Sequence, residues 1–147
     1  MQVNIKKLNE SAVVPSYAKH GDAGMDLTAT SKNYDENGNV VYGTGLAFEI
    51  PIGYVGYVFP RSSNAKKDLL LSNSVGVIDS GYRGEVVLKF KLLNDEKDAL
   101  GQSNAYDYEI GDRIGQIIIM PIPKIEFNVV DELSETERGN GGFGSTN

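Results

Sequence analysis

The chain of 147 residues has the length of a single domain and can bury a hydrophobic core without covalent staples. It has no cysteine and only one histidine, His20, which excludes disulfides, thiolate catalysis and a zinc site built from several Cys or His residues of one chain. The formal net charge of -6 argues against nonspecific nucleic-acid binding, which depends on basic surface, but allows a small anion held by a local cluster of donors.

The start of the sequence carries no charged-then-apolar signal segment, and no apolar run approaches the ~18 residues of a membrane span. We therefore expect a soluble, cytoplasmic protein that binds neither membrane nor nucleic acid.

Strand signals dominate the first half of the sequence. The Asn-Gly pair within Asp35–Asn39 predicts a tight turn between two segments. Short apolar runs at Leu46–Ile50 and Tyr54–Phe59 predict two strands joined by a turn at Pro51–Gly53.

One short helix is predicted after these strands. Ser62 or Ser63 is placed to cap the segment "NAKKDLLL", and Lys66 and Lys67 are expected to face water.

The second half of the sequence again favours strands. Alternation of apolar and polar residues over Glu85–Leu93 predicts a strand with one buried face, and the polar segment 94–112 is typical of a loop. Ile114–Ile122 is nearly all apolar and fits a strand buried on both faces, and apolar residues alternate once more over 125–129. Many short strands between turns indicate an all-β sandwich or barrel.

The four arginines, unlike the ten lysines, all stand in stretches rich in Gly, Ser or Pro. A guanidinium group is a planar fork of donors that fits phosphate or carboxylate, and backbone N–H groups of such turns bind anions. For Arg61 in "PRSS" and Arg138 in "ERGNGG" we favour anion binding. Arg113 in "GDRIG" is better explained by an ion pair with the neighbouring Asp112, and Arg83 lies in "GYRGE".

Five segments carry the most specific pattern and span most of the chain. They are "AGMDL" (Ala23–Leu27), "PRSS" (Pro60–Ser63), "NSVGVIDSGYRGEV" (Asn73–Val86), "GDRIGQIIIMPI" (Gly111–Ile122) and "RGNGGFGSTN" (Arg138–Asn147). Each alone is weak, but in this order and at this spacing they resemble the five motifs of the trimeric dUTPase family, the deoxyuridine 5'-triphosphate nucleotidohydrolases.

The resemblance implies an all-β, jelly-roll-like sandwich or barrel with one short helix. It implies a homotrimer with active sites shared between subunits, in which residues 1–137 form the β domain and 138–147 a flexible, Gly-rich arm that closes over a neighbour's site. The implied reaction is Mg²⁺-assisted hydrolysis of dUTP to dUMP and diphosphate, which limits uracil in DNA and supplies dUMP for dTMP synthesis.

The third motif implies the catalytic and base-reading residues. Asp79 corresponds to the aspartate that activates water, although a lone Asp after a strand is more often a turn former. Tyr82 corresponds to the ring beneath the deoxyribose, with a half-buried core tyrosine as the alternative. The base-reading residues of the hairpin are Asn73, Gly76, Val77 and Ile78.

The second and fourth motifs imply the phosphate site. Arg61, Ser62 and Ser63 correspond to the phosphate-binding turn, and Gln116 to a glutamine near the phosphates. Asp26 of the first motif corresponds to an aspartate that reaches magnesium through water, and the alternative is that it caps a turn.

The fifth motif implies the closing arm. Arg138 is expected to meet the γ-phosphate and Phe143 to stack on uracil, while Gly144, Ser145 and Thr146 contribute a flexible backbone and hydroxyl donors. Without ligand, such a segment has nothing to offset the entropy lost on ordering.

The chain departs from the family pattern at three positions. Gly81 stands where many members are acidic, Ser63 where many have glycine, and Val87 where some have lysine. Two other functions were weighed on the same fold. A dCTP deaminase lacks the aromatic residue of "GYRGE" and the full fifth motif, and a nucleotide-binding regulatory protein does not require Asp79, Tyr82 and the tail together.

Overall fold

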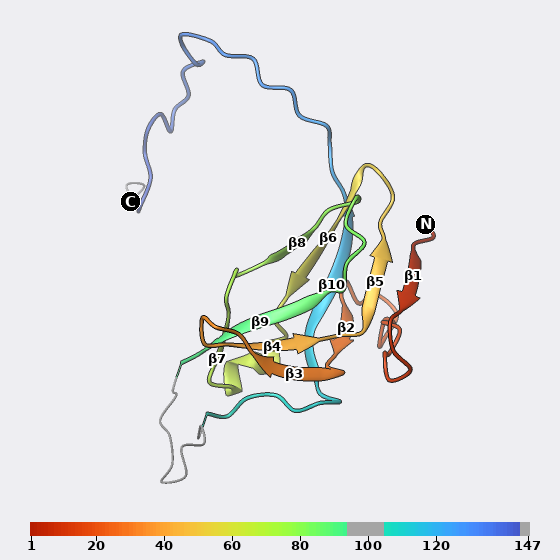
Figure 1. Ribbon diagram of the computed structural model, residues 1–147. Helices are drawn as coiled ribbons and strands as arrows, with labels where there is room; N and C mark the ends of the chain where they lie inside the picture. Colours follow the sequence, from red (N-terminus) through yellow and green to blue (C-terminus); the bar gives the residue numbers. More distant parts are fainter. Residues whose placement is uncertain (94–104, 145–147) are drawn as a thin grey trace.

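The structure, a computed structural model, describes residues 1–93 and 105–144 (Figure 1). Short strands and one 3-10 helix make up its regular structure. The elements are β1 (Asn4–Lys7), β2 (Met25–Thr28), β3 (Ser31–Tyr34), β4 (Asn39–Gly43), β5 (Leu46–Glu49), β6 (Tyr54–Phe59), η1 (Ser62–Lys66), β7 (Leu69–Leu71), β8 (Gly76–Ile78), β9 (Val87–Leu92) and β10 (Arg113–Pro121).

The strands form antiparallel sheets throughout. One four-stranded sheet has the order β2-β10-β6-β8, a second has the order β3-β4-β9-β7, and β1 pairs with β5. Non-consecutive strands lie side by side, as in a jelly roll, so the predicted all-β, jelly-roll-like fold is confirmed. No helix in the described ranges is long and apolar enough to cross a membrane.

A single core cluster draws apolar side chains from both four-stranded sheets and from β5. Alternation along the strands explains this, because every second side chain of β9 turns to the same face. The side chains that are almost fully enclosed are Leu27, Val40, Tyr42, Leu46, Ile50, Val86, Leu88, Phe90, Ile114 and Ile117.

Strand β10 sets the register that brings the first, second and fourth motifs together. Gln116 on β10 lies opposite Asp26 on β2 and opposite Phe59 at the end of β6. Because the chain leaves β6 directly into Pro60 and Arg61, three segments distant in the sequence meet at one corner of this sheet.

Most of the predicted strands and turns are confirmed. Leu46–Ile50 becomes β5, Tyr54–Phe59 is β6, and the alternating stretch from Glu85 becomes β9. Asp35–Asn39 is the turn between β3 and β4, where Gly38 adopts a φ of 72°. Segment 94–112 lies partly outside the described residues, and residues 105–112 carry no strand.

The predicted helix differs in kind and extent. Residues Ser62–Lys66 form a 3-10 helix whose N-cap is Arg61, neither serine caps it through a side chain, and "LLL" forms strand β7. Lys67 does not face water, because its ammonium group donates to the Asp107 carbonyl and lies 3.9 Å from the centre of the Tyr106 ring. These contacts come from a segment 40 residues away, which local periodicity does not report.

The end of the chain departs most from the sequence prediction. β10 is buried at Ile114, Gly115 and Ile117, but Met120 is half exposed, so burial on both faces holds only for its first part. The alternation over 125–129 forms no strand, and Phe127 and Val129 are 94% and 96% exposed. We call residues 122–144 the C-terminal extension. It runs away from the sandwich without forming a strand or helix (Figure 1). Alternating apolar residues form a strand only where a neighbouring strand pairs with them, and the described part of this chain places no strand beside residues 125–129.

Candidate active site

A carboxylate between two arginines forms the most highly charged cluster of the candidate site. Arg61 Nε donates to Asp26 Oδ1 at 2.7 Å, and Arg113 Nη1 donates to Asp26 Oδ2 at 3.1 Å. The predicted pairing of Arg113 with Asp112 is therefore wrong in its partner, because the Asp112 carboxylate instead accepts the backbone N–H of Glu109. Two guanidinium groups and one carboxylate leave this cluster with a formal excess of one positive charge.

The cluster lines an open cleft of about 320 Å³, which we call the arginine cleft. Gln116 fixes one wall by donating from Nε2 to the Pro60 carbonyl at 3.1 Å. A Cβ added to Gly24 would collide with Gln116 Oε1, so any larger residue there would have to displace this amide. The lining residues are Ser16, Ala18, Asp22, Ala23, Gly24, Asp26, Arg61, Arg113 and Gln116.

The serines of the second motif have different surroundings. Ser63 is partly buried, and its Oγ accepts a hydrogen bond from Arg61 Nη1 at 3.0 Å. Ser62 is exposed at the start of η1. The 3-10 turn is closed by the backbone N–H of Asn64, which donates to the Arg61 carbonyl at 2.9 Å.

Asp79 lies in a tight turn directly after β8, which we call the Asp79 turn (Asp79–Tyr82). The backbone N–H of Tyr82 donates to the Asp79 carbonyl at 3.0 Å, and Tyr82 Oη donates to the Glu85 carbonyl at 3.0 Å. The Tyr82 ring lies against Gly84, where any Cβ would collide with it. The Asp79 carboxylate is exposed and forms no hydrogen bond to another described residue.

The hairpin that leads into this turn carries the predicted base-reading residues. Ser74, between β7 and β8, has a φ of 60°, a conformation that costs a non-glycine residue free energy. Asn73 lies in an exposed turn and lines a shallow hollow with Ser72, Val87 and Lys89.

Beyond Asn73, the hairpin continues as β8. Gly76 is buried, and a Cβ there would lie 3.1 Å from Val58 Cβ. Val77 and Ile78 line a smaller hollow of about 140 Å³ together with Asp79 and Tyr82. The predicted residues Val77, Ile78, Asp79 and Tyr82 therefore meet in one stretch of surface, with Gly76 buried behind it.

Arg83 supports the Asp79 turn in a way that the sequence did not predict. Its Nη1 donates to the Ser80 carbonyl at 2.7 Å and to the Tyr82 carbonyl at 2.9 Å. Its Nη2 lies 3.6 Å from Glu49 on β5. Arg83 therefore ties the turn to the neighbouring sheet. The available sequence signal was an arginine between Tyr82 and Gly84, directly after the turn.

The arginine cleft and the Asp79 turn lie at opposite ends of neighbouring strands. Ile78 of β8 lies opposite Gly56 near the start of β6, whereas Arg61 follows the end of β6. Gly56 to Phe59 alone spans about 10 Å, because a strand rises about 3.3 Å per residue. The two sites share no lining residue.

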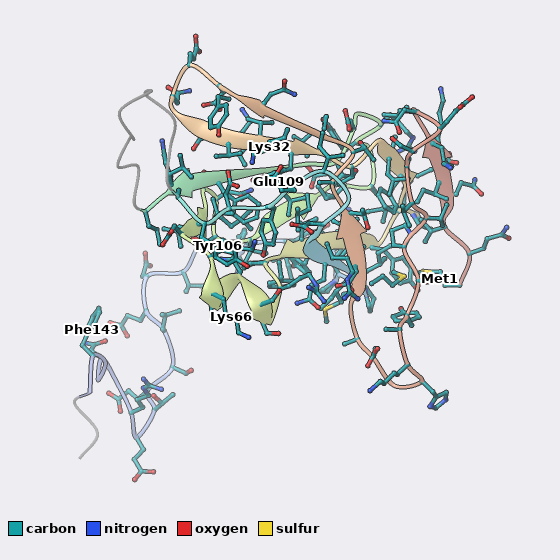
Figure 2. All side chains as sticks on the ribbon, turned by 90° about the horizontal axis from the view of Figure 1, so that it is seen from below. Met1, Lys32, Lys66, Tyr106, Glu109 and Phe143 are labelled. Carbon is teal, nitrogen blue, oxygen red and sulfur yellow. The ribbon has the colours of Figure 1, made fainter. Side chains whose placement is uncertain are left out.

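The fifth motif is far from both sites. Arg138 Nε donates to the Gly141 carbonyl at 3.0 Å, and Gly139 bonds back to the Thr136 carbonyl at 3.0 Å, so the segment closes only local turns. Phe143 is fully exposed and lies well away from the packed body of the molecule (Figure 2). Gly144 has a φ of 84°. Ser145 and Thr146 lie outside the described residues.

The described residues hold no group of three or more His, Cys, Asp or Glu side chains arranged to bind a metal ion. Asp26 is the acidic side chain of the arginine cleft that lies among its cationic groups. Magnesium is commonly held by one or two carboxylates plus substrate phosphates and water, so a single aspartate in an open cleft is a donor of the kind that suits that ion.

The dUTPase family model matches residues 10–147. The chain belongs to the dUTPase family. A deoxyuridine 5'-triphosphate nucleotidohydrolase of Nautilia profundicola is 42% identical to it, covering 99% of both chains. That of Rhodococcus erythropolis is 40% identical over 99% of this chain and 86% of its own length.

Solved dUTPase structures have the same fold. The dUTPase of Staphylococcus bacteriophage 80alpha with dUpNHpp matches with a TM-score of 0.81 and 30% identity, covering 99% of this chain and 98% of its own. A mutant dUTPase of phage phi11 of S. aureus, which coordinates a structural Mg(II) ion, matches with a TM-score of 0.71 and 26% identity over 90% of this chain and 98% of its own.

Proposed function

We propose that this dUTPase family member hydrolyses dUTP to dUMP and diphosphate. The observation that carries the proposal is the pairing of two features: an exposed carboxylate on a turn beside a tyrosine ring, and a separate cleft in which two guanidinium groups flank one carboxylate. The first suits attack by water next to a sugar, and the second suits a polyphosphate.

Asp79 is assigned the role of the base. A water molecule held by its carboxylate attacks the α-phosphorus, its proton passes to the carboxylate, and the bond from the α-phosphorus to the bridging oxygen breaks as diphosphate leaves. The exposed position of Asp79 and its freedom from hydrogen bonds to other described residues support this role, because the carboxylate is open to water.

The triphosphate is assigned to the arginine cleft. Arg61, Ser62, Ser63 and Gln116 bind it, with the guanidinium of Arg61 as the principal donor. Such chemistry depends mainly on positioning and on charge neutralisation. The fixed Arg61 and Gln116 side chains support this assignment.

The β8 hairpin is assigned to the nucleoside. Asn73, Gly76, Val77 and Ile78 read the uracil edge largely through the backbone, which leaves cytosine with unpaired groups. The half-exposed Tyr82 ring packs beneath the deoxyribose and leaves no room for a 2′-hydroxyl group.

Magnesium is assigned to the Asp26 carboxylate, which reaches the ion through bound water. When bound, Mg²⁺ would neutralise charge on the triphosphate oxygens. The contribution of the chain itself is to hold the Asp26 carboxylate between Arg61 and Arg113.

The active site is assigned to the boundary between subunits of a homotrimer. Within one chain, the Asp79 turn and the arginine cleft lie at opposite ends of β6, at least about 10 Å apart along the strand. In the proposed trimer, the Asp79 turn of one chain and the arginine cleft of another therefore complete one site. The exposed apolar residues of the C-terminal extension and the distance of Phe143 from both sites support an arm, residues 138–147, that reaches a neighbouring subunit. Arg138 there meets the γ-phosphate, Phe143 stacks on uracil, and Gly144, Ser145 and Thr146 wrap the phosphates. We place the enzyme in the cytoplasm, with the nucleotide pool.

The test is direct. Incubation of the full-length protein with dUTP and Mg²⁺ is expected to release diphosphate and dUMP, with dCTP, dTTP and UTP as matched controls that stay intact. Sedimentation is expected to give about three chains per particle. Intact dUTP after prolonged incubation contradicts the proposed function, and a fully active monomer contradicts the shared site.

A further inference from the structure

The phenol of Tyr108 lies against the turn that carries Arg61. Tyr108 Oη donates to Asn64 Oδ1 at 3.2 Å. Ser63 Oγ accepts from Arg61 Nη1 at 3.0 Å, and the Ser63 side chain lies near enough to the phenol to lower the pKa of Tyr108. Ser63 is therefore next to both Arg61 and Tyr108, and we call the series Arg61, Ser63, Tyr108 and Asn64 the relay.

Asn64 and Tyr108 are each held in place by further contacts. Asn64 is held by its Nδ2, which donates to the Leu69 carbonyl at 2.8 Å. Tyr108 is only 3% exposed, and its backbone N–H and C=O both bond to Tyr42 Oη, at 3.1 and 2.9 Å. Its ring also packs against Phe90, 5.9 Å between ring centres. Burial raises the pKa of Tyr108, and the Ser63 hydrogen bond and the charge of Arg61 only partly oppose this, so the phenol stays protonated and able to donate at neutral pH.

The segment that carries Tyr108 is anchored on both sides. Lys32 on β3 pairs with Asp107 at 2.9 Å and with Glu109 at 3.2 Å. On the other side, Lys67 lies over the Tyr106 ring. Figure 2 shows Tyr106 and Glu109 between Lys32 and the end of η1 at Lys66. Residues 105–109 therefore bridge strand β3 and the phosphate-binding turn.

We propose that Tyr108 is a positioning residue, acting through Ser63, that holds the Arg61 guanidinium in the orientation in which it meets the triphosphate. The inference rests on the proposed role of Arg61 as a phosphate ligand. Asp26 fixes Nε and Ser63 fixes Nη1, so Nη2 is left without a hydrogen bond to another described residue. A long arginine side chain loses rotamer freedom when it is held for binding, and fixing it in advance removes that cost. Glycine at position 63 has no hydroxyl group for this relay.

The test uses hydroxyl deletions that keep the packing. Tyr108→Phe and Ser63→Ala are each expected to raise KM for dUTP and Kd for dUpNHpp about 3- to 10-fold, the size of one net hydrogen bond. Binding of deoxyuridine, which carries no phosphate, is expected to stay within about twofold. Tyr106→Phe removes a hydroxyl group from the same segment outside the relay and serves as the matched control, with unchanged KM.

A double-mutant cycle separates positioning from mere stability. Ser63→Ala combined with Tyr108→Phe is expected to cost no more than the larger single change, because both interrupt one relay. Additive losses, or a lower Tm with unchanged KM and Kd, overturn the proposal. If the wild-type protein leaves dUTP intact, the proposed function fails, and the Kd for dUpNHpp still decides whether the relay acts on phosphate binding.

Discussion

In the arginine cleft, Asp26 and its two arginines are already paired with one another, whereas the Asp79 carboxylate makes no hydrogen bond to another described residue. The cleft is braced from several directions, by the second and fourth motifs and by Tyr108. The Asp79 turn is braced only from behind, by Arg83 and the Tyr82 hydroxyl group. The difference indicates that the chain fixes the groups proposed to bind phosphate before substrate arrives and leaves its proposed base open to water.

The largest expected effect is at the turn. Asp79→Asn keeps the size of the side chain but removes the proton acceptor, so kcat is expected to fall about 10²- to 10⁴-fold. The Kd for dUpNHpp is expected to change little, because the cleft is intact. Steady-state kinetics and calorimetric titration measure the two quantities, and near-normal turnover would refute the assigned role of the base.

Removal of the arm comes next. Deletion of 138–147 takes away the arginine proposed to bind the γ-phosphate and the ring proposed to stack on uracil, and is expected to lower kcat/KM about 10²-fold. Assembly and Tm are expected to persist, because these residues make no described contact with the sandwich. A truncated protein with full activity would show that the arm is no lid.

A smaller loss is expected in the cleft. Arg61→Ala removes one charge-assisted donor and leaves Asp26 with Arg113 alone, so KM for dUTP is expected to rise about 10- to 100-fold. The matched control is Lys66→Ala, which removes an exposed cation from the same turn without touching Asp26. Equal KM changes in the two variants would mean that general charge, not the cleft, is responsible.

Mixing the two defective proteins tests whether turn and cleft meet across subunits. Equal amounts of Asp79→Asn and Arg61→Ala chains, unfolded and refolded together, are expected to recover about one quarter of wild-type activity. Each shared site is intact only if the chain that supplies the turn carries Asp79 and the chain that supplies the cleft carries Arg61, and each condition is met in about half of the cases. Separately refolded samples combined afterwards are the control. Recovery no higher than in that control would place each site within one chain.

The smallest expected effect concerns a carboxylate outside both regions. Asp35, in the β3–β4 turn, accepts hydrogen bonds from the Asn39 side chain and backbone, which hold its pKa well below the ordinary value. A carboxylate whose pKa is lowered in the folded state stabilises that state above its unfolded pKa of about 4, and the stabilisation is lost as the pH falls below it. Asp35→Ala is therefore expected to lower Tm at pH 7, to flatten the fall in Tm below pH 4, and to leave kcat unchanged. An unaltered acid dependence of Tm would contradict this.

Sequence patterns predicted those features that depend on local spacing. Alternation identified β9, the Asn-Gly pair identified the turn at Asp35–Asn39, and five ordered motifs named most of the residues that meet in the cleft and at the turn. A 3-10 helix was not distinguished from an α-helix, because five residues carry too little periodicity to separate them.

Features that depend on tertiary pairing were missed. The sequence favours an ion pair between Arg113 and its neighbour Asp112, but the pairing of β10 with β2 brings Asp26, 87 residues away, into contact with Arg113 instead. The link from Tyr108 to Asn64 crosses 44 residues and joins two segments with no shared pattern. The apolar alternation over 125–129 was interpreted as a strand, although a strand needs a neighbour that a single chain does not provide.

The exposed stripe of the C-terminal extension, with Phe127 and Leu133 at 94% and 87% exposure, also has a consequence for handling the protein. In the proposed trimer a neighbouring chain covers this apolar surface, so assembly would stabilise the folded state by mass action. The melting temperature is therefore expected to rise with protein concentration, and dilution is expected to favour separate chains whose exposed stripe adsorbs to vessel surfaces.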